Sequence, residues 1–369
     1  MGTRLVGLGK ALPKLEIEND ALQALVDTND EWIFQRTGIR SRHVAVSEST
    51  LELACDAAAL ALGSAASASD GESAWCEEPI DPASIDLVIC ATLSADTLIP
   101  SAAASIKRVL GLENAVAFDL NAACSGFIYG LSVADSMLAA SCALPEGAAK
   151  QTMRRALVVG VDRLSRILDW QDRSTCVLFG DGAGAAVVEW DAEAPGIIAT
   201  CLKTIDDTKN TLTCASIFAS NTPFDEQGKL LGDAEDPSYA TLCESLEVEP
   251  ELMKSTVHMA GQSVFRFASR ALCSGIEAVL EQSGLTIDDI ALIVPHQANE
   301  RIIRYAAKRL DLDMDRFLVS LAHTGNTSAA SVPIALAEAY ASGKIKKGDK
   351  IIAVAFGAGL TYGALLFEA

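Results

Sequence analysis

Residues 118–127 have the sequence FDLNAACSGF. The apolar run that ends at Leu120 is typical of a buried strand, and the run that follows Gly126 is typical of a helix, so we expect the chain to turn from strand to helix here. Cys124 lies at this turn. A cysteine in such a place is either a small buried core residue or a nucleophile displayed at the end of the strand.

The alternation of strand and helix continues on both sides of this turn. Helices are expected over 19–36 (as one helix or two short ones), 49–63 and 101–112, and a strand over 85–95. Such alternation predicts an α/β fold with a substantially parallel core. Two stretches of small, polar and acidic residues, 64–82 and 142–153, interrupt the pattern, and we expect both to be surface insertions.

The second part of the chain resembles the first. Three pairs of segments match in the same order: 82–96 with 286–300, 114–126 with 315–327, and 154–162 with 348–357. Buried parallel strands all look alike, which weakens any single match, but the shared order favours two similar halves. We predict an N-terminal half over 1–195 and a C-terminal half over 196–369. Ligands of α/β proteins bind beyond the carboxyl ends of strands, so a site is expected where the turns of the two halves meet.

The composition argues against several classes of protein. The chain has 369 residues, half of them apolar, and a formal net charge of −20, which argues against nucleic acid as a partner because phosphate binding needs a basic surface. No apolar run reaches the ~20 residues of a membrane span, and the start lacks the apolar core of a signal peptide. We therefore expect a cytoplasmic protein with no membrane partner. The ten cysteines form no CxxC pair, so no metal site is expected.

Three polar residues are candidates for chemistry at the predicted site. A helix N-terminus next to Cys124 would lower the pKa of the thiol. His296, in IVPHQANERII, follows an apolar run and is one of only four histidines, and a cysteine nucleophile usually needs such a partner. Asn326, in GNTS, would by itself be interpreted as a turn or capping residue. Because a cysteine and a histidine are expected on matching turns, we interpret Asn326 as a site residue.

Two glycine-rich segments, 179–189 and 356–368, each combine a glycine turn with an apolar strand. Neither has the spacing of a loop that binds nucleotide phosphates. Their backbone N–H groups could instead bind an oxyanion.

The segments DLNAACSGF, VPHQAN and HTGNTSAAS together make the chain resemble the β-ketoacyl-acyl-carrier-protein synthase III enzymes of the thiolase superfamily. WIFQRTGI, FGDGAGAAVV and FGAGLTYG support the resemblance, which covers essentially the whole chain. It implies a thiolase-like five-layered αβαβα sandwich of two similar halves, usually a homodimer, and an acyltransferase that starts fatty-acid synthesis. A short acyl-CoA would acylate the cysteine. Malonyl-acyl-carrier protein would then lose CO₂, and its enolate would attack the acyl group, with no cofactor beyond the CoA thioester substrate.

The resemblance also implies roles for single residues. Cys124 would be the nucleophile, and His296 and Asn326 would donate hydrogen bonds to the thioester oxygen as the enolate forms. The backbone amides of Cys124 and Ala358 would bind an oxyanion, although Ala358 stands where glycine is common and a loop that needs a positive φ would be lost. Contacts with CoA are implied for Trp32, Arg36, Thr37 and Arg173, of which Trp32 could also be a core anchor. Ile99 would line the acyl pocket of the partner subunit.

A run of basic residues follows His296 in the sequence. Arg301, Arg304, Lys308 and Arg309 fall at helical spacings that share one face, and Arg266 extends this group. Such a face is either an ordinary solvated helix surface or, because acyl-carrier proteins are acidic, a docking surface for the carrier.

Two other functions stay open. The first is a related acyltransferase or condensing enzyme of a polyketide, quinolone or olefin pathway with the same three residues. The second is a non-catalytic partner subunit, which is disfavoured because Cys124, His296 and Asn326 are all present. A degradative thiolase is excluded because it needs a second cysteine near the C-terminus, and none follows Cys273.

Overall fold

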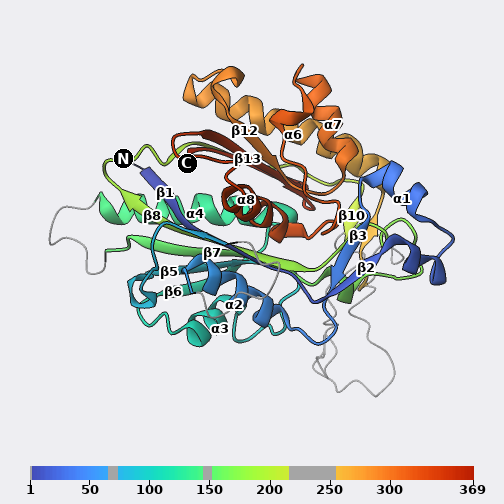
Figure 1. Cartoon of the computed structure of the whole chain (residues 1–369), viewed down its shortest axis with the longest axis horizontal. Helices are drawn as coiled ribbons and strands as arrows, with labels where there is room; N and C mark the ends of the chain where they lie inside the picture. The colour runs from blue at the N-terminus through green and yellow to red at the C-terminus, as the bar shows by residue number, and fades with distance from the viewer. Residues whose placement is uncertain (1, 65–73, 144–151, 216–254) are drawn as a thin grey trace, which may run out of the picture.

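The computed structural model describes residues 2–64, 74–143, 152–215 and 255–369, which form five layers (Figure 1). Two sheets alternate with three layers of helices. The outer layer beside the first sheet holds α2 (Thr50–Ala61) and α3 (Ala102–Leu110), the middle layer holds α4 (Gly126–Cys142) and α8 (Ser331–Ala341), and the outer layer beside the second sheet holds α6 (Gly261–Ser283) and α7 (Glu300–Arg309). The predicted αβαβα sandwich is therefore confirmed.

The first sheet has six strands and the second has four. The order in the first is β4 (Ala74–Cys76), β1 (Gly2–Ala11), β8 (Gly182–Asp191), β7 (Arg155–Asp162), β5 (Leu87–Ala91) and β6 (Val116–Leu120). The order in the second is β12 (Leu292–Pro295), β13 (Lys350–Gly357), β14 (Thr361–Glu368) and β9 (Ile197–Thr204). Two short ribbons lie beside them, β2 (Leu15–Glu18) with β3 (Ser41–Val44), and β10 (Leu212–Thr213) with β11 (His258–Met259).

The pairing of strands is the same in both halves. In the first sheet β5 and β7 are parallel, and β8 and β1 follow in antiparallel order. In the second sheet β12 and β13 are parallel, and β14 and β9 follow in antiparallel order. The two similar halves are thus confirmed, whereas the boundary at 195, which falls between β8 and β9, stays a prediction.

The expectation of a substantially parallel core is wrong for one side of each sheet. Among the described strands of the two sheets, parallel pairing is limited to β7–β5–β6 and β12–β13. Only three residues, 358–360, join β13 to β14. A parallel pair needs a crossover of a dozen or more residues, so a connection this short forces antiparallel pairing.

The expected helices form with clear local signals. Helix α2 begins at a capping box in which Ser49 and Glu52 each bind the other's backbone N–H. The stretch 19–36 forms two short helices, the 3₁₀ helix η1 (Asn19–Ala24) and α1 (Asp30–Thr37). Further 3₁₀ turns are η3 (Pro82–Ser84), η4 (Ala123–Ser125), η5 (Leu164–Ile167), η7 (Ile287–Asp289), η8 (Met314–Arg316) and η9 (Ser328–Ala330).

Helix α4 is enclosed by both sheets. Together with the preceding turn it has the length and composition of a membrane span, which the sequence analysis did not anticipate. Its residues Phe127, Ile128 and Leu131 are nevertheless buried in the central hydrophobic core. A helix covered on two sides must be apolar nearly all round, so α4 is explained as a core helix.

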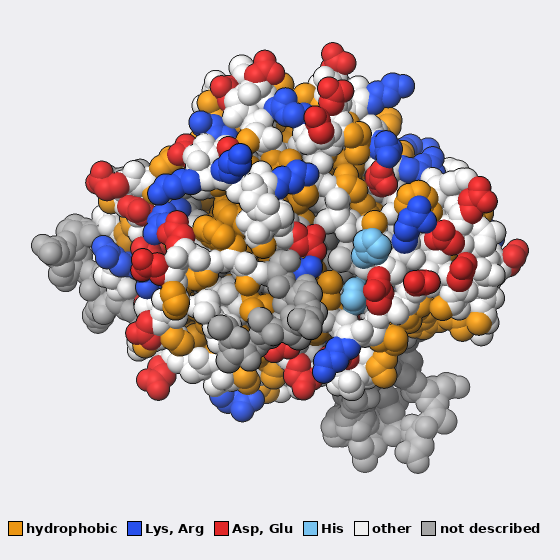
Figure 2. All heavy atoms as spheres, viewed as in Figure 1, with side chains coloured by type: hydrophobic (Ala, Val, Ile, Leu, Met, Phe, Trp, Pro, Cys, Tyr) orange, Lys and Arg blue, Asp and Glu red, His pale blue; other side chains and the backbone are white. Residues whose placement is uncertain are grey.

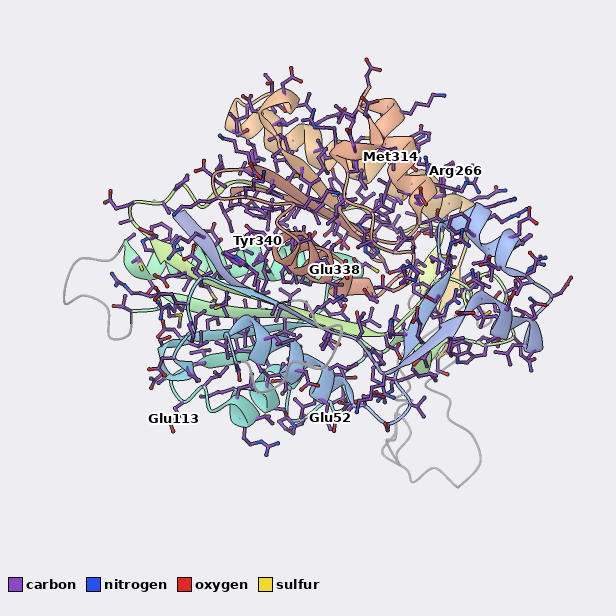
Figure 3. The ribbon with its side chains drawn as sticks, in the orientation of Figure 1. Glu52, Glu113, Arg266, Met314, Glu338 and Tyr340 are labelled. Carbon is purple, nitrogen blue, oxygen red and sulfur yellow. The ribbon has the colours of Figure 1, made fainter. Side chains whose placement is uncertain are left out.

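Part of the stretch 64–82 is not a surface loop, contrary to expectation. Residues 74–76 form β4 and pair with β1 at the edge of the first sheet. The ring centroid of Trp75 lies 4.5 Å from that of Tyr340, which Figure 3 shows on α8. Burial of a large aromatic ring outweighs the polar surroundings in sequence. Residues 65–73, and residues 144–151 of the second predicted insertion, lie outside the described residues.

Candidate active site

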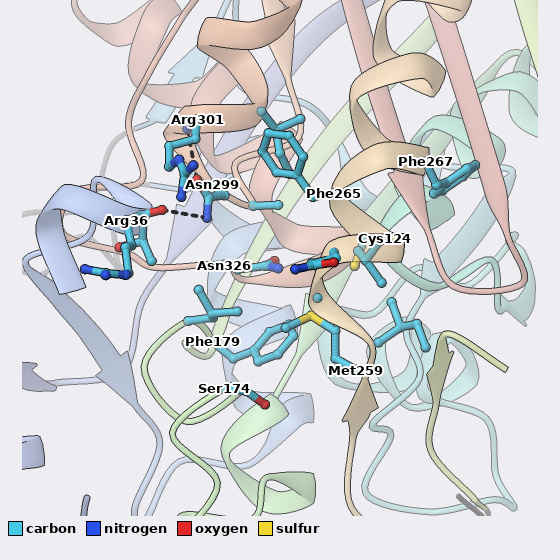
Figure 4. Close-up of a pocket in the computed structure, with 18 of the residues that line it drawn as sticks. Arg36, Cys124, Ser174, Phe179, Met259, Phe265, Phe267, Asn299, Arg301 and Asn326 are labelled. Carbon is cyan, nitrogen blue, oxygen red and sulfur yellow. Dashed lines mark hydrogen bonds between the residues drawn. The ribbon is translucent and has the colours of Figure 1, made fainter. Parts of the chain in front are cut away.

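Cys124, His296 and Asn326 line one pocket of about 600 Å³ (Figure 4). Cys124 lies in η4, between β6 and α4. His296 directly follows β12, and Asn326 lies just before η9. Turns of both halves therefore meet at one site, as the sequence predicted from the repeated pattern. Figure 4 shows the side chains of Cys124 and Asn326 projecting into the same space.

The turn that carries Cys124 is held in place by the second half. The Thr361 hydroxyl donates to the Ala122 carbonyl at 3.2 Å, and the Ser125 hydroxyl donates to the Thr361 carbonyl at 3.3 Å. Ala123 has a φ of 45°, a conformation that residues with a side chain rarely adopt. Such backbone strain persists only where the surroundings fix it, and it is common at functional sites.

The Cys124 thiol is a weak acid in this structure. Its surface is partly exposed to the pocket, but burial by the surrounding protein raises its pKa to about 12, and the nearby charge of Asp162 contributes in the same direction. The Ser328 hydroxyl acts in the opposite direction. The prediction that the helix N-terminus would give this thiol a lowered pKa is therefore wrong, because desolvation of the thiolate dominates.

His296 is buried and held on two sides. Its backbone N–H donates to the Val354 carbonyl at 2.7 Å, and its Nδ1 atom lies 2.5 Å from the Ser331 hydroxyl. The ring packs edge to face against Phe356, with centroids 5.0 Å apart. Burial lowers the pKa of the imidazole to about 3. The ring is therefore neutral at physiological pH, and Nε2 has no protein partner among the described residues.

The side-chain orientation of Asn326 follows from its contacts. Its Oδ1 atom accepts a hydrogen bond from the Ser328 N–H at 2.9 Å, and its backbone N–H donates to the Leu178 carbonyl at 2.9 Å. An amide whose oxygen is occupied has its NH₂ group left to donate. Asn326 lines the pocket, so it offers the pocket a hydrogen-bond donor.

The turn after β13 lies beside these groups. Gly357 and Leu360 line the pocket on either side of Ala358 in sequence. Ala358 does not adopt a positive φ, whereas Gly359 does, with a φ of 129°. The alanine is therefore compatible with the turn, and the concern that it would disturb the backbone at 358 is not supported.

Aromatic and guanidinium groups stack at the rim of the pocket. The guanidinium carbons of Arg36 and Arg173 lie 4.5 Å and 4.7 Å from the ring centroid of Trp32. Trp32 is also partly buried against a small apolar cluster. Its ring therefore packs against that cluster and also lines the pocket. Thr37, which donates to the Ile33 carbonyl at 2.7 Å, also lines the pocket. The four residues assigned to CoA by resemblance thus lie together.

The basic residues divide into two groups. Arg266 and Arg301 line the pocket, and Arg301 lies over the Phe265 ring at 5.8 Å. The other three, Arg304, Lys308 and Arg309, are exposed on the outer face of α7. Figure 2 shows blue side chains over the region where α7 and α1 lie in Figure 1, and Figure 3 shows Arg266 near them. We call Arg301, Arg304, Lys308 and Arg309 the basic patch.

Two sequence comparisons with known proteins identify the family of this chain. The sequence model of 3-oxoacyl-[acyl-carrier-protein (ACP)] synthase III matches residues 118–205, and that of its C-terminal part matches residues 280–369. A β-ketoacyl-[acyl-carrier-protein] synthase III of Clostridium beijerinckii is 41% identical over 99% of this chain and 98% of its own length. The chain belongs to the β-ketoacyl-acyl-carrier-protein synthase III family.

Solved structures agree with this family. The crystal structure of 3-oxoacyl-[acyl-carrier-protein] synthase III from Aquifex aeolicus has a TM-score of 0.81 and 36% identity, and covers 100% of both chains. The priming β-ketosynthase of the R1128 polyketide pathway has a TM-score of 0.79 and 33% identity, and the match covers 100% of this chain and 96% of that one. The protein is therefore a synthase III acyltransferase of the condensing type with a thiolase fold.

Several lining residues of this synthase were missed by the sequence analysis. Leu212, Met259 and Phe265, which come from β10, β11 and α6, are among the apolar residues that line the pocket. Nothing in their local sequence marks them, because they meet only through the fold. Asn299 ties two elements together: its side chain caps α7 and donates to the Arg36 carbonyl at 3.1 Å (Figure 4). Its place before a helical run was a detectable capping signal.

Proposed function

We propose that this synthase joins a short acyl group from acyl-CoA to malonyl-acyl-carrier protein, giving 3-oxoacyl-acyl-carrier protein, CoA and CO₂ through an acyl-Cys124 intermediate. The observation that carries the proposal is the meeting of one thiol, one neutral imidazole and one oriented amide in a single pocket. Covalent catalysis would use the thiol, and stabilisation of an enolate would use the two others.

In the first half-reaction, the Cys124 sulfur bonds to the thioester carbon and the bond from that carbon to the CoA sulfur breaks. The proton of the thiol ends on the released CoA. The backbone N–H groups of Cys124 and Ala358 stabilise the oxyanion of this step. Because a pKa of about 12 keeps the free thiol protonated, the thiol loses its proton only as the acyl-CoA reacts.

In the second half-reaction, the malonyl group loses CO₂ and negative charge develops on its thioester oxygen. His296 and Asn326 donate hydrogen bonds to that oxygen. Both donors are preset by protein contacts, through Nδ1 of the histidine and Oδ1 of the asparagine. Donors that are already oriented need no reorganisation when the charge appears. The enolate carbon then bonds to the acyl carbon, and the Cys124 sulfur leaves as a thiolate that takes up a proton from solvent, which restores the thiol.

The rim of the pocket binds the two carriers. Trp32 and Arg173 sandwich the adenine of CoA, and Arg36 and Thr37 add further contacts; the support is that the four residues line the rim together, with both guanidinium groups beside the Trp32 ring. The basic patch, extended by Arg266, attracts the acidic carrier protein. Four exposed cations on α7, of which Arg301 lines the pocket and Arg304 is paired with Glu300, offset locally the repulsion expected from a net charge of −20.

A homodimer is the proposed assembly. Strand β6 is at the edge of the first sheet, and four large apolar side chains are exposed on or near it: Leu98, Ile99, Val109 and Val116. Unpaired edges that carry apolar residues are suited to pairing with another chain. Ile99, which is 90% exposed, reaches the acyl pocket of the partner subunit in this proposal. The cytoplasm is the proposed location, supported by nine free cysteines among the described residues.

The test is an assay of the purified protein with acetyl-CoA and either malonyl-acyl-carrier protein or malonyl-CoA. The mass of the carrier protein is measured after the reaction. Formation of the 3-oxoacyl carrier, with little condensation when malonyl-CoA is the extender, supports the proposal. Condensation only with malonyl-CoA would indicate a related enzyme of another pathway, and no acylation at all would indicate a non-catalytic subunit.

A further inference from the structure

A buried serine of α8 that does not itself line the pocket contacts the site histidine. The Ser331 Oγ atom lies 2.5 Å from Nδ1 of His296, and both side chains are buried. Ser331 is the first residue of α8, so its position is fixed by a helix that lies between the two sheets. The contact is short enough to be a strong hydrogen bond, and its direction decides which nitrogen of the ring carries the proton.

The direction of the hydrogen bond between Ser331 and His296 follows from the other contact of the Ser331 hydroxyl. The Gln297 N–H donates to Ser331 Oγ at 3.4 Å, so the oxygen already accepts one hydrogen bond. In the part of the chain that the structure describes, Nδ1 of His296 is the acceptor within reach of the hydroxyl proton. A serine hydroxyl has one proton to donate. Donation to Nδ1 satisfies every group, whereas the opposite direction would leave a buried hydroxyl proton without an acceptor, which is unfavourable.

We propose that Ser331 is a positioning residue that holds neutral His296 in the tautomer protonated at Nε2. In that tautomer Nε2, which has no protein partner among the described residues, is a donor, and the histidine cannot accept a proton from Cys124 through it. The inference rests on the proposed function, because a donor at this place is what the malonyl thioester oxygen requires. The inference goes beyond the proposed function because it assigns Ser331 as the residue that makes His296 a donor and not a base.

The contact with Ser331 is necessary because the His296 ring is uncharged. A protonated imidazole would donate through both nitrogens and would need no such control. Burial lowers the pKa of His296 to about 3, so the ring has a single proton at physiological pH. The partner of one nitrogen then sets the state of the other.

The first readout is spectroscopic and does not depend on activity. The chain has four histidines, so long-range ¹H–¹⁵N spectra of the ¹⁵N-labelled protein contain four ring systems, and His296→Gln identifies the one of interest. We expect the pattern of an Nε2-protonated ring in the wild type, a mixed or Nδ1-protonated pattern in Ser331→Ala, and a return to the wild-type pattern in Ser331→Thr. An Nδ1-protonated ring in the wild type overturns the proposal, even if the condensation itself occurs.

The second readout separates the half-reactions. Ser331→Ala should lower the rate of malonyl decarboxylation by about tenfold at saturating substrate and leave acylation of Cys124 unchanged, and Ser331→Thr should restore the rate. Ser342→Ala is the matched control, since Ser342 is the C-cap residue of the same helix and, among the described residues, its hydroxyl donates to the Glu338 and Ala339 carbonyls of that helix; it should have no effect on either half-reaction. Equal loss of both half-reactions in Ser331→Ala, or an unchanged ring pattern, would show a structural role alone.

Discussion

Gly357 approaches the backbone of Cys124 so closely that a Cβ atom on Gly357 would lie 2.7 Å from the Cys124 nitrogen. The two residues belong to different halves of the chain, at the end of β13 and in η4. A contact of that length is not tolerated between heavy atoms that are not hydrogen-bonded. The turn that carries Cys124 and the turn that follows β13 are therefore packed backbone to backbone.

The close approach of Gly357 to Cys124 predicts the effect of adding a single methyl group at position 357. Gly357→Ala should displace one of the two turns and lower the rate of Cys124 acylation by at least tenfold, with a decrease in melting temperature. Acylation is followed by the mass of the intact protein after exposure to acetyl-CoA. The neighbouring Ala358→Gly is the control, since only its backbone amide is used, and it should stay within about threefold of wild type. Wild-type acylation by Gly357→Ala would show that the turns are not coupled.

The half-reactions should be separable by mutation. His296→Ala and Asn326→Ala should each lower malonyl decarboxylation by 10²–10³-fold, because a preset donor to a developing oxyanion is typically worth about 3 kcal/mol. Acylation of Cys124 should persist in both. Release of CO₂ from malonyl-acyl-carrier protein is the measurement, with acyl-enzyme mass as the control. Full decarboxylation in either variant would remove that residue from the proposed role.

The basic patch should matter for the carrier and not for CoA. Reversing two charges, in Arg301→Glu with Arg309→Glu, should raise KM for malonyl-acyl-carrier protein several-fold at low ionic strength. The difference in this KM between wild type and variant should decrease with added salt, because the Debye length falls to about 10 Å at 0.1 M and charge attraction is screened. The variant should still be acylated by acetyl-CoA near the wild-type rate. An unchanged KM at low salt would assign the patch to an ordinary solvated surface and leave Arg266 as the next candidate.

Burial of His296 makes stability depend on pH. The imidazole has a folded-state pKa of about 3 against an ordinary value of 6.5, so below pH 6.5 the unfolded state binds a proton that the folded state does not. Stability should therefore fall with decreasing pH, by about 1.4 kcal/mol per unit from this group. Urea unfolding of wild type and His296→Gln should show a stability difference that changes by about 2 kcal/mol between pH 7.5 and 5. A constant difference would mean that His296 titrates normally.

The local sequence was sufficient for those features that depend on neighbours in the chain. The capping box at Ser49 and Glu52 and the strand-to-helix turn at Cys124 are of this kind, and the matching order of segments predicted that turns of both halves would meet. Features that depend on the assembled fold were not predictable. The pKa of Cys124 is set by burial, and burial is decided by elements distant in sequence.

The same limit applies to the residues that support the site. Ser331 contacts His296 across 35 positions of sequence, and β4 forms because Trp75 finds Tyr340 on α8. Neither pairing has a local pattern. The apolar lining from β10, β11 and α6 was missed for the same reason. That Cys124, His296 and Asn326 would lie together was thus accessible from the sequence, whereas their electrostatic surroundings were not.

The central claim is that the acyl group is carried on Cys124. The most direct measurement exposes the protein to acetyl-CoA without an extender, digests it at low pH to protect thioesters, and maps the added mass by peptide mass spectrometry. One acetyl group on the peptide that contains Cys124, its absence in Cys124→Ser, and its transfer to product on addition of malonyl-acyl-carrier protein are the predicted results. An acetyl group mapped to another cysteine, or condensation that proceeds in Cys124→Ser at the wild-type rate, would contradict the account.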